Sequence, residues 1–382
     1  MTITAKSRLA LLRVEQNDPI LTHLLICEPP TNVPTEGHHF AMTPISTDGP
    51  ALKRLIDGIG DNIHLKDVRF DTPSGLANAV ADAECFEALK KNTSIGSLGL
   101  SRCVLSHGVG HEVLKAFEEN GEYLRKLAVW RCGRMVKSSR LTLCATLRGC
   151  TSLHDISLTA CNIHDELVEN LVEAIRGHKE VKKLDLHDND ITSVGAVALS
   201  TLLTDPNSTL KQLDLNNNLI DDIGAKAVSS ALYTNRTLTA VNLDENDDIS
   251  ISGWNSFHKV LCDTSSIEAT HNSNHTIRMI ASFWRFDEDG IIPNYLMGLI
   301  ELNGRYCKNK RNVRRTKILG HHFNNEVNTQ RSIAENLPME LKVLPHMLEW
   351  IGAAENDMSR VTMFNVIRQL PALCEIAKNN GI

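Results

Sequence analysis

The stretch that decides the fold is VKKLDLHDN, residues 181–189, which returns as LKQLDLNNN at residues 210–218. Five further segments align with these two, and they begin at Leu65, Ile95, Leu124, Leu153 and Leu238. The steps between successive starts are 30, 29, 29, 28, 29 and 28 residues. A spacing this regular over seven segments predicts a repeat architecture rather than a single thick core.

Within each nine-residue segment, positions 1, 4 and 6 are apolar, as in Val181, Leu184 and Leu186. Positions 4 and 6 have the two-residue period of a strand with one buried face. Position 9 holds a small polar side chain in six of the segments, namely Cys103, Cys132, Cys161, Asn189, Asn218 and Asn246. A buried polar group there must be hydrogen-bonded where the strand turns away. Only Pro73, in the first segment, breaks the pattern.

The second half of each repeat has helical spacing. ITSVGAVALSTLLTD, from Ile191, and IDDIGAKAVSSALYT, from Ile220, place apolar residues three and four positions apart. One strand and one helix cannot bury their apolar faces alone, but stacked copies share a continuous core. We therefore expect an α/β fold, a right-handed β-α superhelix with a parallel sheet on its concave face.

The pattern from about Leu65 to Thr270 resembles the ribonuclease-inhibitor-like subfamily of leucine-rich-repeat proteins. This resemblance implies a horseshoe-shaped solenoid with strands inside and helices outside. It implies little about function, because one scaffold serves many purposes.

Three regions are expected: an N-terminal capping unit at 1–62, the solenoid at 63–282 and a helical C-terminal region at 283–382. The capping unit combines a strand from Leu21, a surface loop at 29–45 and a helix near Pro50. Ile267 begins the weakest strand, which is expected to close the solenoid. After residue 283 the sequence predicts an apolar helix and two later helices, the first of these two interrupted by Pro345.

Composition limits the possible functions. The net charge of −6 gives no reason to expect nucleic acid, and no run of 18 apolar residues predicts a membrane span. Without an export signal, the ten cysteines are expected to be free thiols in a reducing compartment. We expect a monomer in the cytoplasm, with the nucleus as an alternative.

Positions 3, 5 and 7 of the strands are expected to face the concave surface, which is where a protein partner would bind. Trp130 is a large aromatic residue that packing does not require, with Arg69, Arg102, Lys126 and Arg131 near it. Tryptophan and arginine are the residues most enriched at binding hot spots. The alternative is that Trp130 packs over a neighbouring strand as part of the fold.

Polar and acidic residues follow on the later strands: Asp155, Asp185, His187, Asp188, Asp214, Asn216, Asp244 and Glu245. Adjacent parallel strands lie about 4.8 Å apart, so these carboxylates would form a ladder of like charges. A basic partner would offset the repulsion. The alternative is a solvated acidic face, since aspartate is common at position 5 of such repeats.

No catalytic motif was found: the sequence lacks G-x-S-x-G, H-E-x-x-H and a P-loop. Stacking brings Cys103, Cys132 and Cys161 together, but nothing completes a tetrahedral metal site and asparagine replaces cysteine in later repeats. We therefore expect no metal and no cofactor. The basic cluster at 308–317 is either a solvated helix, a localisation signal or a segment that docks on the acidic ladder.

The sequence thus favours a non-enzymatic scaffold that binds a protein on its concave face. Two alternatives stay open. One is a regulator of a small Ran-like GTPase, in which Arg69, Arg102 or Arg131 would serve as the catalytic arginine. The other is an inhibitor of a basic enzyme such as a ribonuclease, which the acidic ladder would permit.

Overall fold

The computed structural model describes residues 11–27, 41–44, 49–72, 83–133, 136–281, 293–305, 310–318 and 321. One parallel sheet of nine strands runs through these residues in the order β2-β1-β3-β4-β5-β6-β7-β8-β9. The strands are β1 (His23–Cys27), β2 (Ala41–Pro44), β3 (Asp67–Asp71), β4 (Ser97–Ser101), β5 (Lys126–Trp130), β6 (Asp155–Thr159), β7 (Lys183–Asp185), β8 (Gln212–Asp214) and β9 (Ala240–Asn242).

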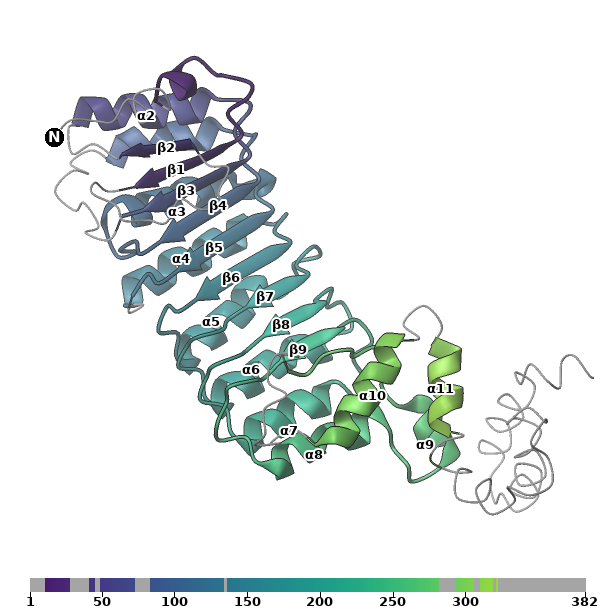
Figure 1. The fold of residues 1–382 in the computed structure, drawn as a ribbon. Helices are drawn as coiled ribbons and strands as arrows, with labels where there is room; N and C mark the ends of the chain where they lie inside the picture. Colours follow the sequence, from purple (N-terminus) through teal and green to yellow (C-terminus); the bar gives the residue numbers. More distant parts are fainter. Residues whose placement is uncertain are drawn as a thin grey trace, which may run out of the picture.

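Helices follow the strands in sequence and form a second layer against the sheet (Figure 1). These are α2 (Gly49–Asp61), η1 (Ala83–Lys91), α3 (Gly108–Asn120), η2 (Gly121–Tyr123), α4 (Lys137–Gly149), α5 (Asp165–Ile175), α6 (Ser193–Thr204), α7 (Asp222–Ala231) and α8 (Ile251–Leu261). The predicted β-α solenoid is confirmed. Among the described residues, no helix combines the length and apolar character needed to cross a bilayer.

The core lies between the two layers. Every residue at positions 1, 4 and 6 of the seven predicted segments is buried, as Val181, Leu184 and Leu186 illustrate. The apolar cluster is continuous from Val14 to Ile300. Because each repeat packs on its neighbours, this one core joins the N-terminal cap, the repeats and the first helix after them.

The turn after each strand has a fixed backbone conformation. Position 8 has a positive φ in six successive repeats, at Arg102, Arg131, Ala160, Asp188, Asn217 and Glu245. Such left-handed conformations cost free energy for residues other than glycine, so they persist only where surrounding bonds hold them. The side chain at position 9 supplies those bonds.

Asn189 shows how position 9 works. Its Oδ1 accepts the backbone N–H groups of Cys161 and Ile163 from the preceding repeat, at 3.0 and 3.1 Å. Its Nδ2 donates to the carbonyls of Leu158, Leu186 and His187. The cysteines in the same slot donate their thiols to carbonyls of the previous strand, Cys103 to Phe70 and Cys161 to Val129. The thiols are therefore structural.

Seven cysteines are buried and form no disulfide: Cys27, Cys103, Cys132, Cys144, Cys150, Cys161 and Cys262. The side-chain contact with Cys103 raises the pKa of the Cys132 thiol, and the contact with Cys161 and burial act in the same direction. A protonated thiol is neither a good nucleophile nor a metal ligand. For these residues, the expectation of free thiols is confirmed.

A second ladder joins the first turns of the later helices. Asp165 accepts the backbone N–H groups of Thr192 and Gly195 in the next repeat, both at 2.9 Å. Asp222 does the same two repeats later, for Ser250 and Gly253. A Cβ on Gly195 would lie 2.6 Å from Asp165 Oδ1, so glycine is needed where the carboxylate approaches the backbone.

The N-terminal end differs from the prediction. The predicted surface loop at 29–45 contains β2, Ala41–Pro44, which pairs in parallel with β1 on the side opposite β3. The prediction of a loop is therefore wrong for residues 41–44, while the rest of it lies outside the described residues. The predicted strand and helix of the capping unit correspond to β1 and α2.

The C-terminal end also differs. Ile267 does not begin a strand, because Ile267–Asn272 is the helix α9. The strand-like segment lies ten residues later, where the N–H of Val241 donates to Met279 and that of Leu243 donates to Ile280. The helix α9 lengthens the last repeat. Extending the regular repeat spacing to Ile267 therefore predicted a strand in the wrong segment.

Two helices close this end: α10 (Asn294–Arg305), the predicted apolar helix, packs on α8, and α11 (Lys310–Ile318) packs on α9. The Nζ of Lys310 donates to Thr276 at 3.2 Å, and the buried Nζ of Lys317 donates to the Leu261 carbonyl. The basic helix thus contacts the end of the solenoid. The prediction that its cluster docks on the acidic ladder is wrong for these two lysines. The two later predicted helices lie outside the described residues.

We predict that Asn189→Ala destabilises the protein by at least about 3 kcal/mol, since two buried N–H groups and three carbonyls each lose a partner. Urea denaturation followed by circular dichroism measures the change. Asn216→Ala is the control, because Asn216 lies half-buried on the concave surface. Equal midpoints for the two variants would show that the ladder does not stabilise the turn.

We predict that acid weakens the C-terminal cap through His275. Its ring contacts the His271 carbonyl at 3.1 Å and the Lys317 Nζ at 3.3 Å. Burial and the Lys317 charge lower the pKa of His275 to about 3, so between pH 6.5 and 3 the unfolded state binds more protons than the folded state.

The stability contributed by neutral His275 is therefore complete above about pH 6.5 and is lost as the pH falls, by about 1.4 kcal/mol per unit. Urea midpoints of the wild type and of His275→Gln at pH 7 and pH 5 test this. The wild type should lose about 2 kcal/mol more than the variant; parallel losses would contradict the assignment.

Candidate functional site

A hollow on the concave face lies over the middle of the sheet. Its floor consists of small residues at position 5 of three adjacent strands, Gly99 on β4, Ala128 on β5 and Ser157 on β6, which are direct neighbours in register. Because these side chains are short, they leave a space of about 380 Å³ above the sheet. This volume is large enough to receive side chains of a partner.

Charged residues border this hollow on both sides, on β3 at one side and on β7 at the other. Arg69 of β3 lies across Gly99, where an added Cβ would be 2.8 Å from the Arg69 Cγ. On the other side stand Lys183 and Asp185 of β7, whose Nζ and Oδ2 are 3.3 Å apart. The rim along the strands contains Lys126 and Trp130 of β5 and Asp155 of β6. The hollow therefore presents both signs of charge.

Trp130 is the most exposed of the aromatic residues at this surface, with 49% of its area accessible. The guanidinium carbon of Arg131 lies 5.1 Å from the centre of its ring. This cation–π contact holds the two side chains together beside the hollow. About half of the Trp130 surface is thus accessible beside the hollow.

Arg102 has a different role from Arg131. It forms a two-point ion pair with Asp71, and its Nε lies 2.8 Å from the Asp71 Oδ1. Asp71 is buried, so Arg102 compensates a buried charge at the end of β3. Two of the three arginines considered for a GTPase-activating role contact aspartates, since Arg69 Nη2 also lies 3.3 Å from Asp67.

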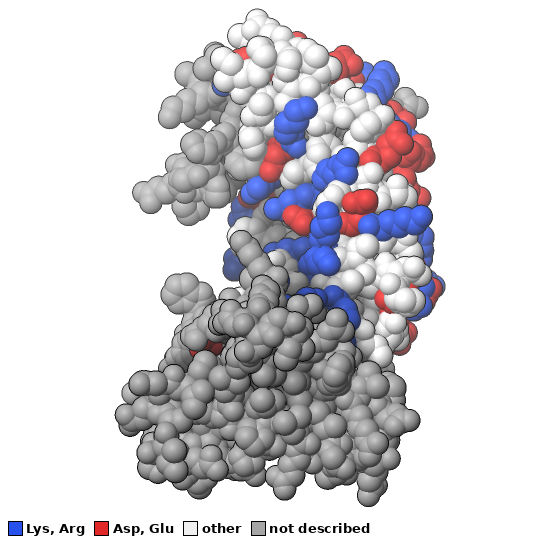
Figure 2. All heavy atoms as spheres, turned by 90° about the vertical axis from the view of Figure 1, so that its right-hand side faces the viewer, with Lys and Arg blue, Asp and Glu red and all other residues white. Residues whose placement is uncertain are grey.

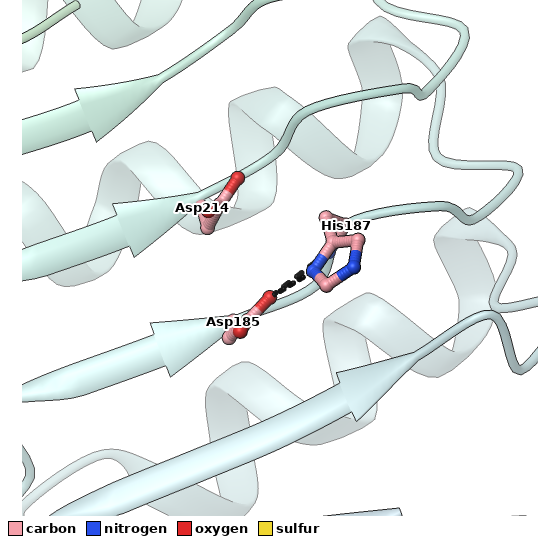
Figure 3. A group of neighbouring side chains, drawn as sticks. All are labelled: Asp185, His187 and Asp214. Atoms are coloured by element: carbon pink, nitrogen blue, oxygen red, sulfur yellow. Dashed lines mark hydrogen bonds and ion pairs between the residues drawn. The ribbon is translucent and has the colours of Figure 1, made fainter. Parts of the chain in front are cut away.

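At the edge of the hollow, Asp185 of β7, Asp214 of β8 and His187, which follows β7, form a cluster (Figure 3). The Nδ1 of His187 lies 2.7 Å from the Asp185 Oδ1, and this hydrogen bond raises the pKa of His187. Burial tends to raise the pKa of Asp185, but the His187 hydrogen bond lowers it overall. Burial raises the pKa of Asp214, and the Asp185 carboxylate adds to this.

More of the carboxylates in the predicted acidic ladder have hydrogen-bond or ion-pair partners than the sequence indicated. Asp188 accepts the Asn217 Nδ2 at 2.8 Å, Asp244 is buried, and Asn216 is half-buried. Glu245 is exposed in its turn. None of these four residues lines the hollow, so the structure separates them from Arg69, Lys126, Trp130, Asp155 and Asp185, which do.

The edge at which the strands begin is basic. Exposed lysines and arginines occupy the same place before or at the start of successive strands, at Lys66, Arg125, Lys126, Lys182, Lys211 and Arg278. Figure 2 views this edge and shows lysines and arginines along it, with acidic groups between them. The concave face therefore has cations where its strands begin and several carboxylates where they end.

The residues that form the floor were not predicted as site residues. Gly99, Ala128 and Ser157 carry no distinctive chemistry, and they matter only because larger residues surround them. A run of small residues at position 5 of three consecutive strands is the signal that could have identified them. Lys183 was missed because the acidic residues dominated the interpretation of its strand.

Comparison with models of protein families finds one match in the later repeats. Residues 180–200 and 207–229 match the family model described as Leucine Rich repeat. Among solved structures, the crystal structure of the Rad7 and Elc1 complex in yeast aligns at 12% identity over 75% of this chain and 87% of that chain, with a TM-score of 0.28. No curated protein matches the chain.

We predict that Arg102→Ala lowers stability by about 1–2 kcal/mol, because it leaves the buried Asp71 carboxylate without its cation. Arg131→Ala is a matched control, since both positions have positive φ and both residues are exposed. Thermal unfolding of the two variants measures the difference. Equal melting temperatures would show that Arg102 is available to a partner after all.

Proposed function

We propose that this protein is a non-enzymatic scaffold that binds another protein on its concave face, at the hollow beside Trp130. The observation that carries this proposal is the combination of a pre-formed hollow with a half-exposed tryptophan held by Arg131. Pre-formed surfaces bind well because little conformational entropy is lost on association. The repeat length of 28–30 residues, with a helix in most units, supports the ribonuclease-inhibitor-like subclass.

The charges at the hollow favour a particular kind of partner segment. Lys126 and Lys183 flank Asp155 on the adjacent strands, and Lys183 also contacts Asp185. A purely basic partner would therefore meet cations as well as carboxylates. We propose a segment that inserts a small or medium apolar side chain over Ala128 and pairs with both charges around it. A rim that carries both positive and negative side chains contributes more to the specificity and orientation of binding than to its affinity.

Affinity capture from the native cell with the full chain tests the proposal. Ala128→Arg fills the hollow, and Trp130→Ala removes the aromatic surface, which for a hot spot costs about 2 kcal/mol or more, or roughly 30-fold in affinity. Recovery of the partner should fall at least tenfold with each variant.

Leu141→Arg is the matched control, because Leu141 is 61% exposed on the helix α4. It introduces the same charge and should not change recovery. Unchanged recovery with Ala128→Arg and Trp130→Ala would move the binding site away from the concave hollow.

A further inference from the structure

A second feature of the concave face adjoins the hollow, since Asp185 lines the hollow and also belongs to a cluster of possible metal ligands. Asp185, His187 and Asp214 each direct one ligand atom toward the others, and these atoms all lie within 4.8 Å of one another. We propose that these three side chains bind one divalent transition-metal ion of the zinc class.

The fold brings the three ligands together. Asp185 and Asp214 are register partners on the adjacent parallel strands β7 and β8, so their side chains leave the sheet side by side. His187 follows Asp185 by two residues and therefore lies on the same face. Figure 3 shows the imidazole directed toward Asp185, with Asp214 next to both on the neighbouring strand.

The distances suit a common ion. Ligand bonds to zinc are about 2.0–2.2 Å long, so neighbouring donors in a tetrahedral site lie about 3.4 Å apart. The donor atoms of the three side chains lie within 4.8 Å of one another. The 2.7 Å hydrogen bond between Asp185 Oδ1 and His187 Nδ1 would open to about 3.4 Å as the ion takes the place of the shared proton. Three protein ligands leave at least one position for water or for a donor from a partner.

The charges also favour a cation. Two carboxylates lie close together, of which Asp185 is 7% exposed and Asp214 is half-buried. Lys183 and His187 contact Asp185, but within the described part of the chain Asp214 forms no ion pair. Its carboxylate accepts the backbone N–H of Asn216 at 3.1 Å and a hydrogen bond from the Asn242 side chain, and neither of these partners carries a charge. A divalent ion would neutralise both carboxylates and would leave the imidazole neutral.

The ligand types decide between classes of metal. Calcium and magnesium prefer sites built entirely from oxygen, whereas an imidazole with two carboxylates suits Zn²⁺, Co²⁺ or Mn²⁺. The outer contacts orient the ligands as in known metal sites: the Asn216 N–H holds Asp214, and the Lys183 Nζ contacts the second oxygen of Asp185.

Isothermal titration calorimetry of the full chain, freed of metal by chelation, tests the proposal with Zn²⁺ and with Mg²⁺ at pH 7.5. Because the chain has 16 histidines, the comparison is made between variants. The double variant His187→Gln/Asp214→Asn should lose one equivalent of Zn²⁺ or bind it at least tenfold more weakly. The wild type should bind Mg²⁺ far more weakly than Zn²⁺.

Asp188→Asn is the matched control, because Asp188 is an exposed acid one residue away and asparagine tolerates its left-handed backbone. It should retain the full Zn²⁺ isotherm. Titration with Co²⁺ adds a second measurement, since its visible absorption should change with the wild type and the control but not with the double variant. Identical Zn²⁺ isotherms for wild type and double variant would overturn the proposal, and equal affinity for Mg²⁺ would overturn the class of metal.

Discussion

The structure depends on how each strand leaves the sheet. At that point the backbone turns through a left-handed residue at position 8, and the amides and carbonyls around it are turned into the interior. A side chain from position 9 bonds them, and it reaches both its own repeat and the preceding one, as Asn189 does with Cys161 and Leu158. Since every repeat needs its neighbour's side chain, the units are stable only as a stack.

This constraint separates the residues that build the fold from those that can serve function. Positions 4, 6 and 9 face the interior and vary little in character. Positions 3, 5 and 7 face the concave surface, where size and charge can change without affecting the core. The hollow over Gly99 and Ala128, the exposed Trp130 and the cluster around His187 all occupy such positions. Asp71 is an exception at position 7, because it is buried and Arg102 of the neighbouring repeat compensates its charge.

The regular repeats were predictable and the ends were not. Seven strands followed from spacing, because apolar side chains at fixed positions are required for burial. The four residues of β2 have no such pattern and pair only because β1 leaves an open edge. At the other end, α9 lengthens the last repeat, and the polar Thr270 and Asn272 at positions 4 and 6 were the local signal that Ile267 does not begin a strand. Candidate binding residues could be chosen from the sequence by their residue type. The ion pairs of Arg102 and Asp185 could be identified only from the three-dimensional structure.

Photocross-linking in the native cell tests the concave-face assignment most directly. A benzoylphenylalanine placed at Lys126, on the rim of the hollow, would react with whatever protein lies there; the same group at Val197, exposed on α6, samples the helical face. The account predicts a discrete covalent adduct with one protein from position 126 and none from position 197. Adducts from position 197 alone would show that the partner binds the helices and that the concave hollow is not the site.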